Sequence, residues 1–408
     1  MLRMAYLFER FPSFGQTFCY REVAELERQG AEVSVFSIRR RTGEPAQDWD
    51  ESIVRRVTYL PEEAQLVQEI DRAARAGELP AAAVNGLKEW GRQPDFLRLY
   101  QAAYIGLRLR TASIQQVHAH FAGMAARTAY WIRQFFGIEF SLTAHANDIF
   151  APRDFVVGLP KLFDAASAVV TVSDFAVARL KTQFPGHAAK FHGVYNGVDL
   201  ALFRAAQFGG NIPLVLSIGR LIEKKGFADL IAACAMLKQR GQDFRCEIIG
   251  EGPLEGPLRA QIAEAQLQES VQLIGPRTQS QIAERLASGT IFVLPCRKDA
   301  TGDMDNLPTV IMEAMAAGLP VISTALAGIP EMVQSGITGE LVPPNDHAAL
   351  AEAMAALASN AALSRQYGAR GRELAGTKFS LEKNVASLAA ILSGRGESVR
   401  SPSANNRS

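Results

Sequence analysis

Apolar runs alternate with amphipathic segments from the start of the chain. Residues 4–8 form an apolar run that predicts a buried strand, and residues 17–29 have the spacing of an amphipathic helix. Residues 11–16 predict the loop between them, and residues 33–38 predict the next strand. Gly30 stands where a helix C-cap is expected. Because parallel strands need a crossover of this kind, the opening predicts a doubly wound α/β fold.

The alternation is interrupted once and then resumes. Residues 62–112 are polar and helix-rich, which predicts a helical insertion. Further strands are predicted near Val117 and over residues 140–143, 168–172 and 190–195. Asn196-Gly197-Val198-Asp199 is typical of a turn, and the polar stretch after it ends at Pro213. We therefore expect an N-terminal Rossmann-like domain over residues 1–205.

A second set of strands and helices follows Pro213. Strands are predicted over residues 214–218, 245–249, 271–274, 291–294, 321–323 and 340–342, with helical patterns between them. This predicts a C-terminal Rossmann-like domain over residues 206–393. We expect its last helix to pack back on the N-terminal domain. Residues 394–408 have no apolar face and are expected to be disordered.

Composition excludes several classes of function. The net charge is +1, from 43 lysine and arginine against 42 aspartate and glutamate residues, so no global attraction to nucleic acid follows. The four cysteines have no C-x-x-C spacing and predict reduced, buried thiols. No apolar run is long enough to span a membrane, and no cleavable signal is evident. The sequence predicts a cytoplasmic protein.

A loop with positive charge follows the first strand of the C-terminal half. In Ser217-Ile218-Gly219-Arg220, an apolar strand ends at Gly219, and Lys225 precedes the next helix, near Gly226. Ligands of open α/β sheets bind at the carboxyl ends of strands. A diphosphate there would meet Arg220 in a bidentate pair and one of the lysines of the loop as a point charge.

A second group of polar residues follows the strand at residues 291–294. Asp305 and Asn306 precede Pro308, which suits a first helical turn. Free amides at a helix start bind anions or sugar hydroxyls. Glu313 lies on that helix among apolar neighbours, a setting that favours a functional carboxylate.

Three histidines fall at expected strand ends of the first half. They are His118, His120 and His145. His118 and His120 should place both rings on one face, but no third carboxylate ligand is evident, so we expect no metal. His145 is better placed as a hydrogen-bonding group that faces a cleft.

Taken in order, these motifs resemble the retaining GT-B glycosyltransferases of family 4, in particular the bacterial enzymes that build exopolysaccharide and colanic-acid-type repeats. The resemblance spans nearly the whole chain. It rests on Phe11-Pro-Ser-Phe-Gly-Gln-Thr-Phe18 with Glu22, His118-Ala-His-Phe121, Thr143-Ala-His145, Asn196-Gly-Val-Asp199, Gly219-Arg220 with Lys225-Gly226, Ile249-Gly-Glu-Gly-Pro253, Asn306-Leu-Pro and Glu313-Ala-Met-Ala-x-Gly318.

The resemblance implies catalytic roles for five residues. Arg220 and Lys225 would neutralise the donor diphosphate, and Glu313 would hold the ribose hydroxyls. Asp305 would contact the transferred sugar, and His145 would hydrogen-bond it. The remaining donor-binding residues implied by the resemblance are Gly15, Gly219, Gly250, Gly275, Asn306, Leu307, Pro308 and Thr309.

The chain departs from the family pattern twice. Asp305 replaces the usual glutamate and is one methylene shorter, and the first loop has a single glycine, Gly15. The resemblance implies that the C-terminal domain binds a nucleotide-diphosphate sugar and that the N-terminal domain is the acceptor side. A hexose would pass from this donor to a lipid-linked saccharide acceptor, with retention and without a metal or other cofactor. Base recognition would involve the loop at Gly275-Pro276-Arg277.

Other functions share parts of this pattern. Asp303-Met304-Asp305 spells the D-x-D of metal-dependent transferases, but it comes late in the chain and before a helix. Gly250-Glu251-Gly252 begins a dinucleotide-binding pattern whose last glycine falls one residue late. A nucleotide-sugar epimerase or a non-catalytic sugar-nucleotide-binding protein would use the same scaffold.

A contact with the inner face of the plasma membrane is a further expectation. Arg92, Arg98, Arg108 and Arg110 alternate with apolar residues and predict a basic amphipathic face for anionic lipid. A helix packed on the first sheet, with a solvated basic edge, explains the same pattern.

Overall fold

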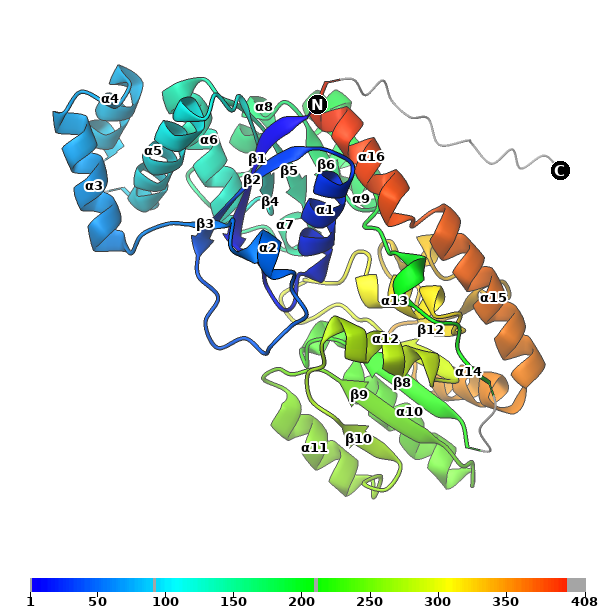
Figure 1. Cartoon of the computed structure of the whole chain (residues 1–408). Coiled ribbons are helices and arrows are strands. Elements are labelled where there is room, and N and C mark those ends of the chain that lie inside the picture. Colours follow the sequence, from blue (N-terminus) through cyan, green and yellow to red (C-terminus); the bar gives the residue numbers. More distant parts are fainter. Residues whose placement is uncertain (1, 91–92, 209–211, 395–408) are drawn as a thin grey trace.

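Two parallel sheets form the framework of the chain, whose computed structural model describes residues 2–90, 93–208 and 212–394. Figure 1 shows them as two bodies, each with its helices, one above the other. The first sheet has seven strands in the order β3-β2-β1-β4-β5-β6-β7, and the second has six in the order β10-β9-β8-β11-β12-β13. In both sheets the strand order reverses beside the first strand, which is the doubly wound arrangement. The predicted fold class is confirmed.

The N-terminal sheet is built from short strands with apolar residues on both faces. Burial on both faces is why the centre of the first strand reads as a continuous apolar run. The strands are β1 (Arg3–Arg10), β2 (Glu32–Arg39), β3 (Thr58–Tyr59), β4 (Gln116–His120), β5 (Glu139–Ala144), β6 (Val169–Thr171) and β7 (Phe191–Gly193).

Helices cover both faces of this sheet. Helix α1 (Thr17–Arg28) has its C-cap at Gln29, and the following Gly30 has φ +86°, the left-handed conformation expected after a helix. The others are α2 (Glu51–Val54), α3 (Glu63–Arg75), α4 (Ala81–Trp90), α5 (Phe96–Thr111), α6 (Met124–Phe136), α7 (Ala146–Phe150), α8 (Leu159–Ala165) and α9 (Asp174–Gln183). The predicted helical insertion is thus three helices, α3 to α5, of which α4 and α5 pack on α6 (Figure 1).

The C-terminal sheet matches the predicted strands to within one residue at each end. Its strands are β8 (Leu214–Ile218), β9 (Arg245–Ile249), β10 (Val271–Leu273), β11 (Ile291–Leu294), β12 (Val321–Thr324) and β13 (Gly339–Val342). The helices are α10 (Phe227–Gln239), α11 (Glu255–Glu264), α12 (Gln279–Ala287), α13 (Thr309–Ala316), α14 (His347–Ser359), α15 (Ala361–Thr377) and α16 (Leu381–Leu392).

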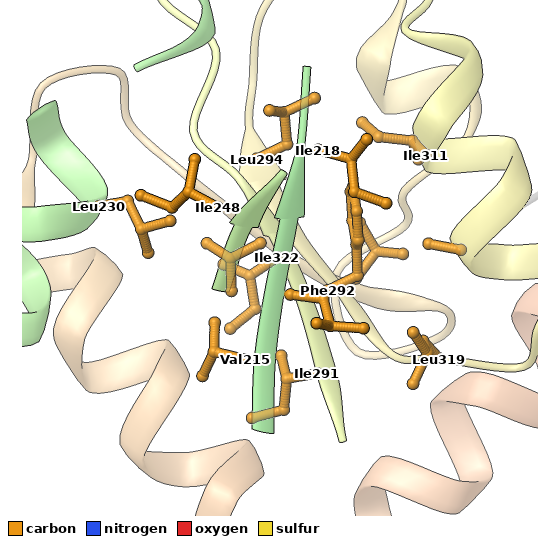
Figure 2. Close-up of a cluster of buried hydrophobic side chains, with 14 of the residues drawn as sticks. Val215, Ile218, Leu230, Ile248, Ile291, Phe292, Leu294, Ile311, Leu319 and Ile322 are labelled. Atoms are coloured by element: carbon orange, nitrogen blue, oxygen red, sulfur yellow. The ribbon is translucent and has the colours of Figure 1, made fainter. Parts of the chain in front are cut away.

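The core of this domain surrounds its central strands. Figure 2 shows Val215 and Ile218 of β8 among side chains of the neighbouring strands and of the helices on both faces. Phe292 of β11 is fully buried. These residues fix the position of β8 and β11, the two strands whose carboxyl ends carry the candidate site.

The last helix returns to the N-terminal domain. Helix α16 lies beside α1 (Figure 1), and its Val385, Leu388 and Leu392 join a core cluster that includes Met4 and Tyr6 of β1. The chain therefore passes between the two sheets twice, once before β8 and once before α16.

The two crossing segments touch each other. Val198 forms a parallel bridge with Ser380, and its amide donates to the carbonyl of Phe379 at 2.8 Å. The segment around Asn196-Gly197 is therefore extended, and the predicted turn there is wrong. A Cβ on Gly197 would lie 2.2 Å from Cα of Leu381, so the glycine permits this close contact.

All four cysteines are free and buried, as predicted. Among the described residues, no helix is long and apolar enough to cross a bilayer. The prediction of a disordered tail falls on residues 395–408, which lie outside the described residues.

Candidate active site

Two glycines bring the loops after β8 and β9 into contact. Gly250 has φ +147°, and a Cβ there would lie 1.9 Å from the carbonyl oxygen of Gly219. Gly252 has φ +157°, and its Cβ would lie 2.6 Å from the carbonyl oxygen of Leu221. Only glycine fits both the conformation and the space at these positions. The loop after β8 thereby takes the shape that presents Arg220.

Arg220 is exposed and faces the N-terminal domain. A Cβ on Gly15 would lie 3.9 Å from Cδ of Arg220, so the first loop of one domain approaches the guanidinium of the other. Within the described part of the chain, Arg220 takes part in no ion pair, although most nearby charges do. Its five N–H donors are available to an anion between the two loops.

The two neighbouring lysines both form ion pairs with carboxylates. Lys225 lies 2.6 Å from Oδ2 of Asp305, and Lys224 lies 2.7 Å from Oδ2 of Asp303 and 3.7 Å from Oδ1 of Asp305. Burial disfavours the charged form of Asp305, but Lys225 and Lys224 outweigh it and keep the pKa of Asp305 below its ordinary value. Burial likewise disfavours the ammonium of Lys225, and Asp305 outweighs it, so the pKa of Lys225 is raised. The loop at 303–305 is thus held by two ammonium groups.

The start of α13 offers unbonded donors. Pro308 occupies the N-cap position and the helix begins at Thr309, one residue later than predicted. Oδ1 of the buried Asn306 accepts a hydrogen bond of 2.7 Å from Oγ of Ser173, whereas Nδ2 of Asn306 has no partner within the described residues. In that same part of the chain, the amides of Asn306, Leu307 and Thr309 donate no hydrogen bond. These groups suit sugar hydroxyls or phosphate oxygens.

Glu313 is paired across the two domains. Nη2 of Arg21, on α1, donates to Oε1 of Glu313 at 2.6 Å, and Nε of Arg21 donates to Oε1 of Gln279 at 2.9 Å. Arg21 is 7% exposed and Glu313 is 3% exposed, so this is a buried ion pair. Oε2 of Glu313 forms no hydrogen bond within the described residues and stays open to a ligand.

His145 belongs to a buried chain of hydrogen-bonding groups. Its Nε2 lies 3.2 Å from Nδ1 of His120, and Nε2 of His120 lies 3.0 Å from Oε1 of Glu22. The hydroxyl of Tyr6 donates to the same oxygen of Glu22 at 2.8 Å. The rings of Phe18 and Phe121 pack on His145.

The proton affinities of these rings differ. Burial, followed by the neighbouring His120 and His118, lowers the pKa of His145 well below its ordinary value. Burial acts in the same direction on His120, but its contacts with Cys19 and Glu22 outweigh burial and raise its pKa to about 10. His145 is therefore an uncharged hydrogen-bonding group beside a charged His120.

The expectation that the histidines lack a carboxylate neighbour is wrong. Glu22, His118 and His120 each offer a ligand atom, and these atoms lie within 4.8 Å of one another. Both nitrogens of His118, however, are hydrogen-bonded to hydroxyls, Ser141 at 2.8 Å and Thr143 at 2.9 Å. Glu22 and His120 therefore form a hydrogen-bonded chain toward His145, and the absence of a metal stays a prediction.

The structure thus brings Arg220, Lys225, Asp305 and the start of α13 to one edge of the C-terminal sheet, opposite Gly15. Gly275 lies behind this edge, where its carbonyl accepts from the amide of Gly250 at 3.0 Å. The roles of these residues remain predictions.

Four partners of these residues were missed by sequence reasoning. They are Arg21, Glu22, Ser173 and Lys224. Arg21 and Lys224 look like solvated charges in sequence, because their partners are 292 and 79 positions away. For Glu22, its place in the first family motif was the available signal. Ser173 precedes α9 as an N-cap, a local role that conceals its contact with Asn306.

Comparisons with known proteins follow the same division of the chain. Residues 15–202 match the family described as Glycosyltransferase Family 4, and residues 201–374 match Glycosyl transferases group 1. The putative colanic acid biosynthesis glycosyltransferase WcaL of Salmonella typhimurium is 30% identical over 368 residues, which cover 87% of this chain and 90% of the relative. The amylovoran biosynthesis glycosyltransferase AmsK of Erwinia amylovora is 45% identical over 137 residues, 34% of each chain.

Solved structures share the fold at lower identity. A glycosyltransferase from Rickettsia africae superposes with a TM-score of 0.72 at 18% identity, covering 97% of this chain and 98% of the other. Anabaena Alr3699/HepE in complex with UDP gives 0.71 at 18% identity, with 97% and 100% covered. From the match to WcaL over most of both chains, together with the two family regions, the chain belongs to the family 4 glycosyltransferases.

Proposed function

We propose that this glycosyltransferase moves a hexose from a nucleotide-diphosphate sugar to a saccharide acceptor, with retention of configuration and without a metal ion. The observation that carries the proposal is the exposed guanidinium of Arg220, opposite Gly15 and without an ion-pair partner among the described residues. A diphosphate between the two loops would supply the missing negative charge.

Relatives support this choice of donor and pathway. The structural neighbour HepE of Anabaena is described in complexes with UDP and with UDP-glucose. Relatives of this chain are named for the synthesis of colanic acid and amylovoran. We therefore propose a role in exopolysaccharide synthesis, with an acceptor that is lipid-linked and a protein that works in the cytoplasm at the inner membrane surface.

Charge compensation by lysine supports metal-independent catalysis. The two aspartates of Asp303-Met304-Asp305 already pair with Lys224 and Lys225. An ammonium at this position offsets carboxylate charge that a D-x-D site would use for a divalent cation. Full turnover in EDTA is expected, and a requirement for added Mg²⁺ or Mn²⁺ would contradict this part of the proposal.

The transfer itself is an exchange at the anomeric carbon. The bond from this carbon to the diphosphate oxygen breaks while the acceptor oxygen bonds on the same face, and the acceptor proton passes to the leaving phosphate. Arg220 and Lys225 would stabilise the charge that develops on the diphosphate. A well-aimed donor in such a site contributes roughly 3–4 kcal/mol to the transition state.

The other groups would position the donor. The open Oε2 of Glu313 would accept from the ribose hydroxyls, while Arg21 holds Oε1. Nδ2 of Asn306 and the amides at the start of α13 would bind sugar and phosphate oxygens. Asp305 is held by two lysines, and the neutral His145 would hydrogen-bond the transferred hexose from the opposite domain.

Donor binding can be tested without an acceptor. Wild-type protein and Arg220→Ala are titrated calorimetrically with UDP, GDP, UDP-glucose and GDP-mannose. We expect one nucleotide to bind wild type at least tenfold more tightly than the variant. No binding of any of them at millimolar concentration would overturn the proposal. The bound donor is then incubated with membrane lipid extract: glycosylated lipid supports the transferase, whereas an epimerised donor or an unchanged one supports the alternative functions.

A further inference from the structure

Arg98, in the first turn of α5, is a buried cation with unused donors. Arg98 is 6% exposed, and within the described part of the chain its Nε and Nη1 make no hydrogen bond. It was predicted to belong to an exposed basic face, and that prediction is wrong for Arg98. Its burial follows from the packing of α5 against α6, which leaves Leu99 and Ala102 in the core.

The charges around Arg98 do not cancel. Arg127, Asp95, Glu9 and Arg39 all act on its charge. Arg127 forms a salt bridge with Asp95, and Arg39 lies 3.2 Å from Glu9. These pairs use both carboxylates, so one positive charge remains, and it belongs to Arg98.

A buried guanidinium without a counter-ion is costly. Removing a charge from water without pairing it is strongly unfavourable. Burial, with a smaller contribution from Arg127, lowers the pKa of Arg98 to about 10, so the group still carries its charge at neutral pH. A hydrophobic residue would pack in the same place at lower cost. An anion bound beside Arg98 would remove this cost by pairing with its charge.

The position lies on the edge of the N-terminal sheet where a substrate is expected. Glu9 stands near the carboxyl end of β1, and Arg39 is the last residue of β2. Arg127 lies in the second turn of α6, just after β4 ends at His120. The loop with Gly15 follows β1 at the same edge, which faces Arg220. The arginines thus lie on the acceptor side of the proposed site.

We propose that Arg98, together with Arg127, binds an oxyanion carried by the acceptor, either a phosphate of a lipid carrier or the carboxylate of an acidic sugar. This assignment rests on the proposed function for its substrate, but anion binding itself can be measured without turnover. The incoming anion takes the two unused donors of Arg98 and competes with Asp95 for Arg127.

The test measures binding of inorganic phosphate and of glucuronate by calorimetry. It uses an Arg220→Ala background, so that the donor loop contributes less. We expect Arg98→Met to weaken the preferred anion at least tenfold and Arg98→Lys to weaken it by less. Arg110→Met, at the far end of α5, serves as the control and should leave affinity unchanged. Preference for phosphate assigns a lipid phosphate, and preference for glucuronate assigns an acidic sugar.

Thermal unfolding separates this role from a structural one. Arg98→Met removes an unpaired buried charge, so its Tm should equal or exceed that of the parent, whereas loss of a structural arginine would lower it. Equal affinity of the parent and Arg98→Met for both anions would overturn the proposal. Anion binding that depends on Arg98, in a protein that binds no nucleotide sugar, would instead overturn the proposed function alone.

Discussion

Arg21 and Glu313 form a buried ion pair of 2.6 Å although they are 292 positions apart in the chain. Arg21 comes from the first helix of one domain and Glu313 from the helix that starts at the candidate donor site of the other. The pair joins the two domains at the point where a ribose would be held.

Breaking this pair should lower stability. Arg21→Met leaves the carboxylate of Glu313 buried without a partner, and loss of one member of a buried pair costs about 3–5 kcal/mol. Denaturant unfolding should show this loss, and the double variant Arg21→Met, Glu313→Met should recover much of it. A double variant as unstable as the sum of both single variants would contradict a direct interaction.

Glu313→Gln tests the role in ribose binding. The amide keeps the shape of the side chain but loses the charge, so the donor KM should rise at least as much as kcat falls. Steady-state kinetics with varied donor concentration measure both. A donor KM that stays flat would remove Glu313 from ribose binding.

Arg220 and Lys225 should differ in their effect on stability but agree in their effect on turnover. Arg220→Ala and Lys225→Ala should each lower kcat by about two orders of magnitude. Arg220 is exposed, so its loss should leave Tm unchanged, whereas Lys225→Ala weakens the charge compensation of Asp305 and should lower Tm. Near-normal turnover in both variants would show that neither lies at the diphosphate.

Gly250 should not tolerate a side chain. In Gly250→Ala the new Cβ would meet the carbonyl oxygen of Gly219 at 1.9 Å, so both Tm and donor affinity should fall. Gly186→Ala is the matched control because nothing lies within 4 Å of a Cβ there and its φ is not in the left-handed region. The control should keep or slightly raise Tm, because alanine restricts the unfolded chain. Equal Tm for both variants would be evidence against the close loop contact.

The titration of His120 should make the free energy of unfolding depend on pH. Its pKa is raised to about 10 in the folded protein, above the ordinary 6.5, through its contacts with Cys19 and Glu22 despite burial. This stabilisation is fully present below pH 6.5 and is lost as the pH rises toward 10. The free energy of unfolding of wild type relative to Glu22→Gln should therefore fall over this range. A constant difference would mean that His120 does not titrate there.

The helices and strands predicted correctly are those whose residue pattern lies within the element itself. The strands at 214–218, 245–249 and 291–294 coincide with the predicted ranges, because a strand buried on both faces is a continuous apolar run. Strand β3, with two residues, is too short to produce such a pattern. The segment around Gly197 has turn-forming residues, but its conformation is set by contact with Leu381.

Sequence motifs identified most residues of the candidate site, but they did not show which side chains pair with one another. Motifs pointed to Arg220, Asp305 and Glu313, because their order along the chain is a property of the sequence. The partners depend on how the two domains meet. Arg98 shows the limit most clearly, since its place in an alternating basic pattern does not reveal that α5 is buried against α6.

The contact between Val198 and Ser380 has a mechanical consequence. The two connections between the domains run side by side there, joined by backbone hydrogen bonds, so they would act as one hinge and not as two independent tethers. Rotation about it would separate Arg21 from Glu313 and widen the entrance for donor, while the hinge itself stays intact. Such an opening would also break the hydrogen bonds of Ser173 with Asn306 and of Arg21 with Gln279, so these polar contacts would together set how readily product leaves.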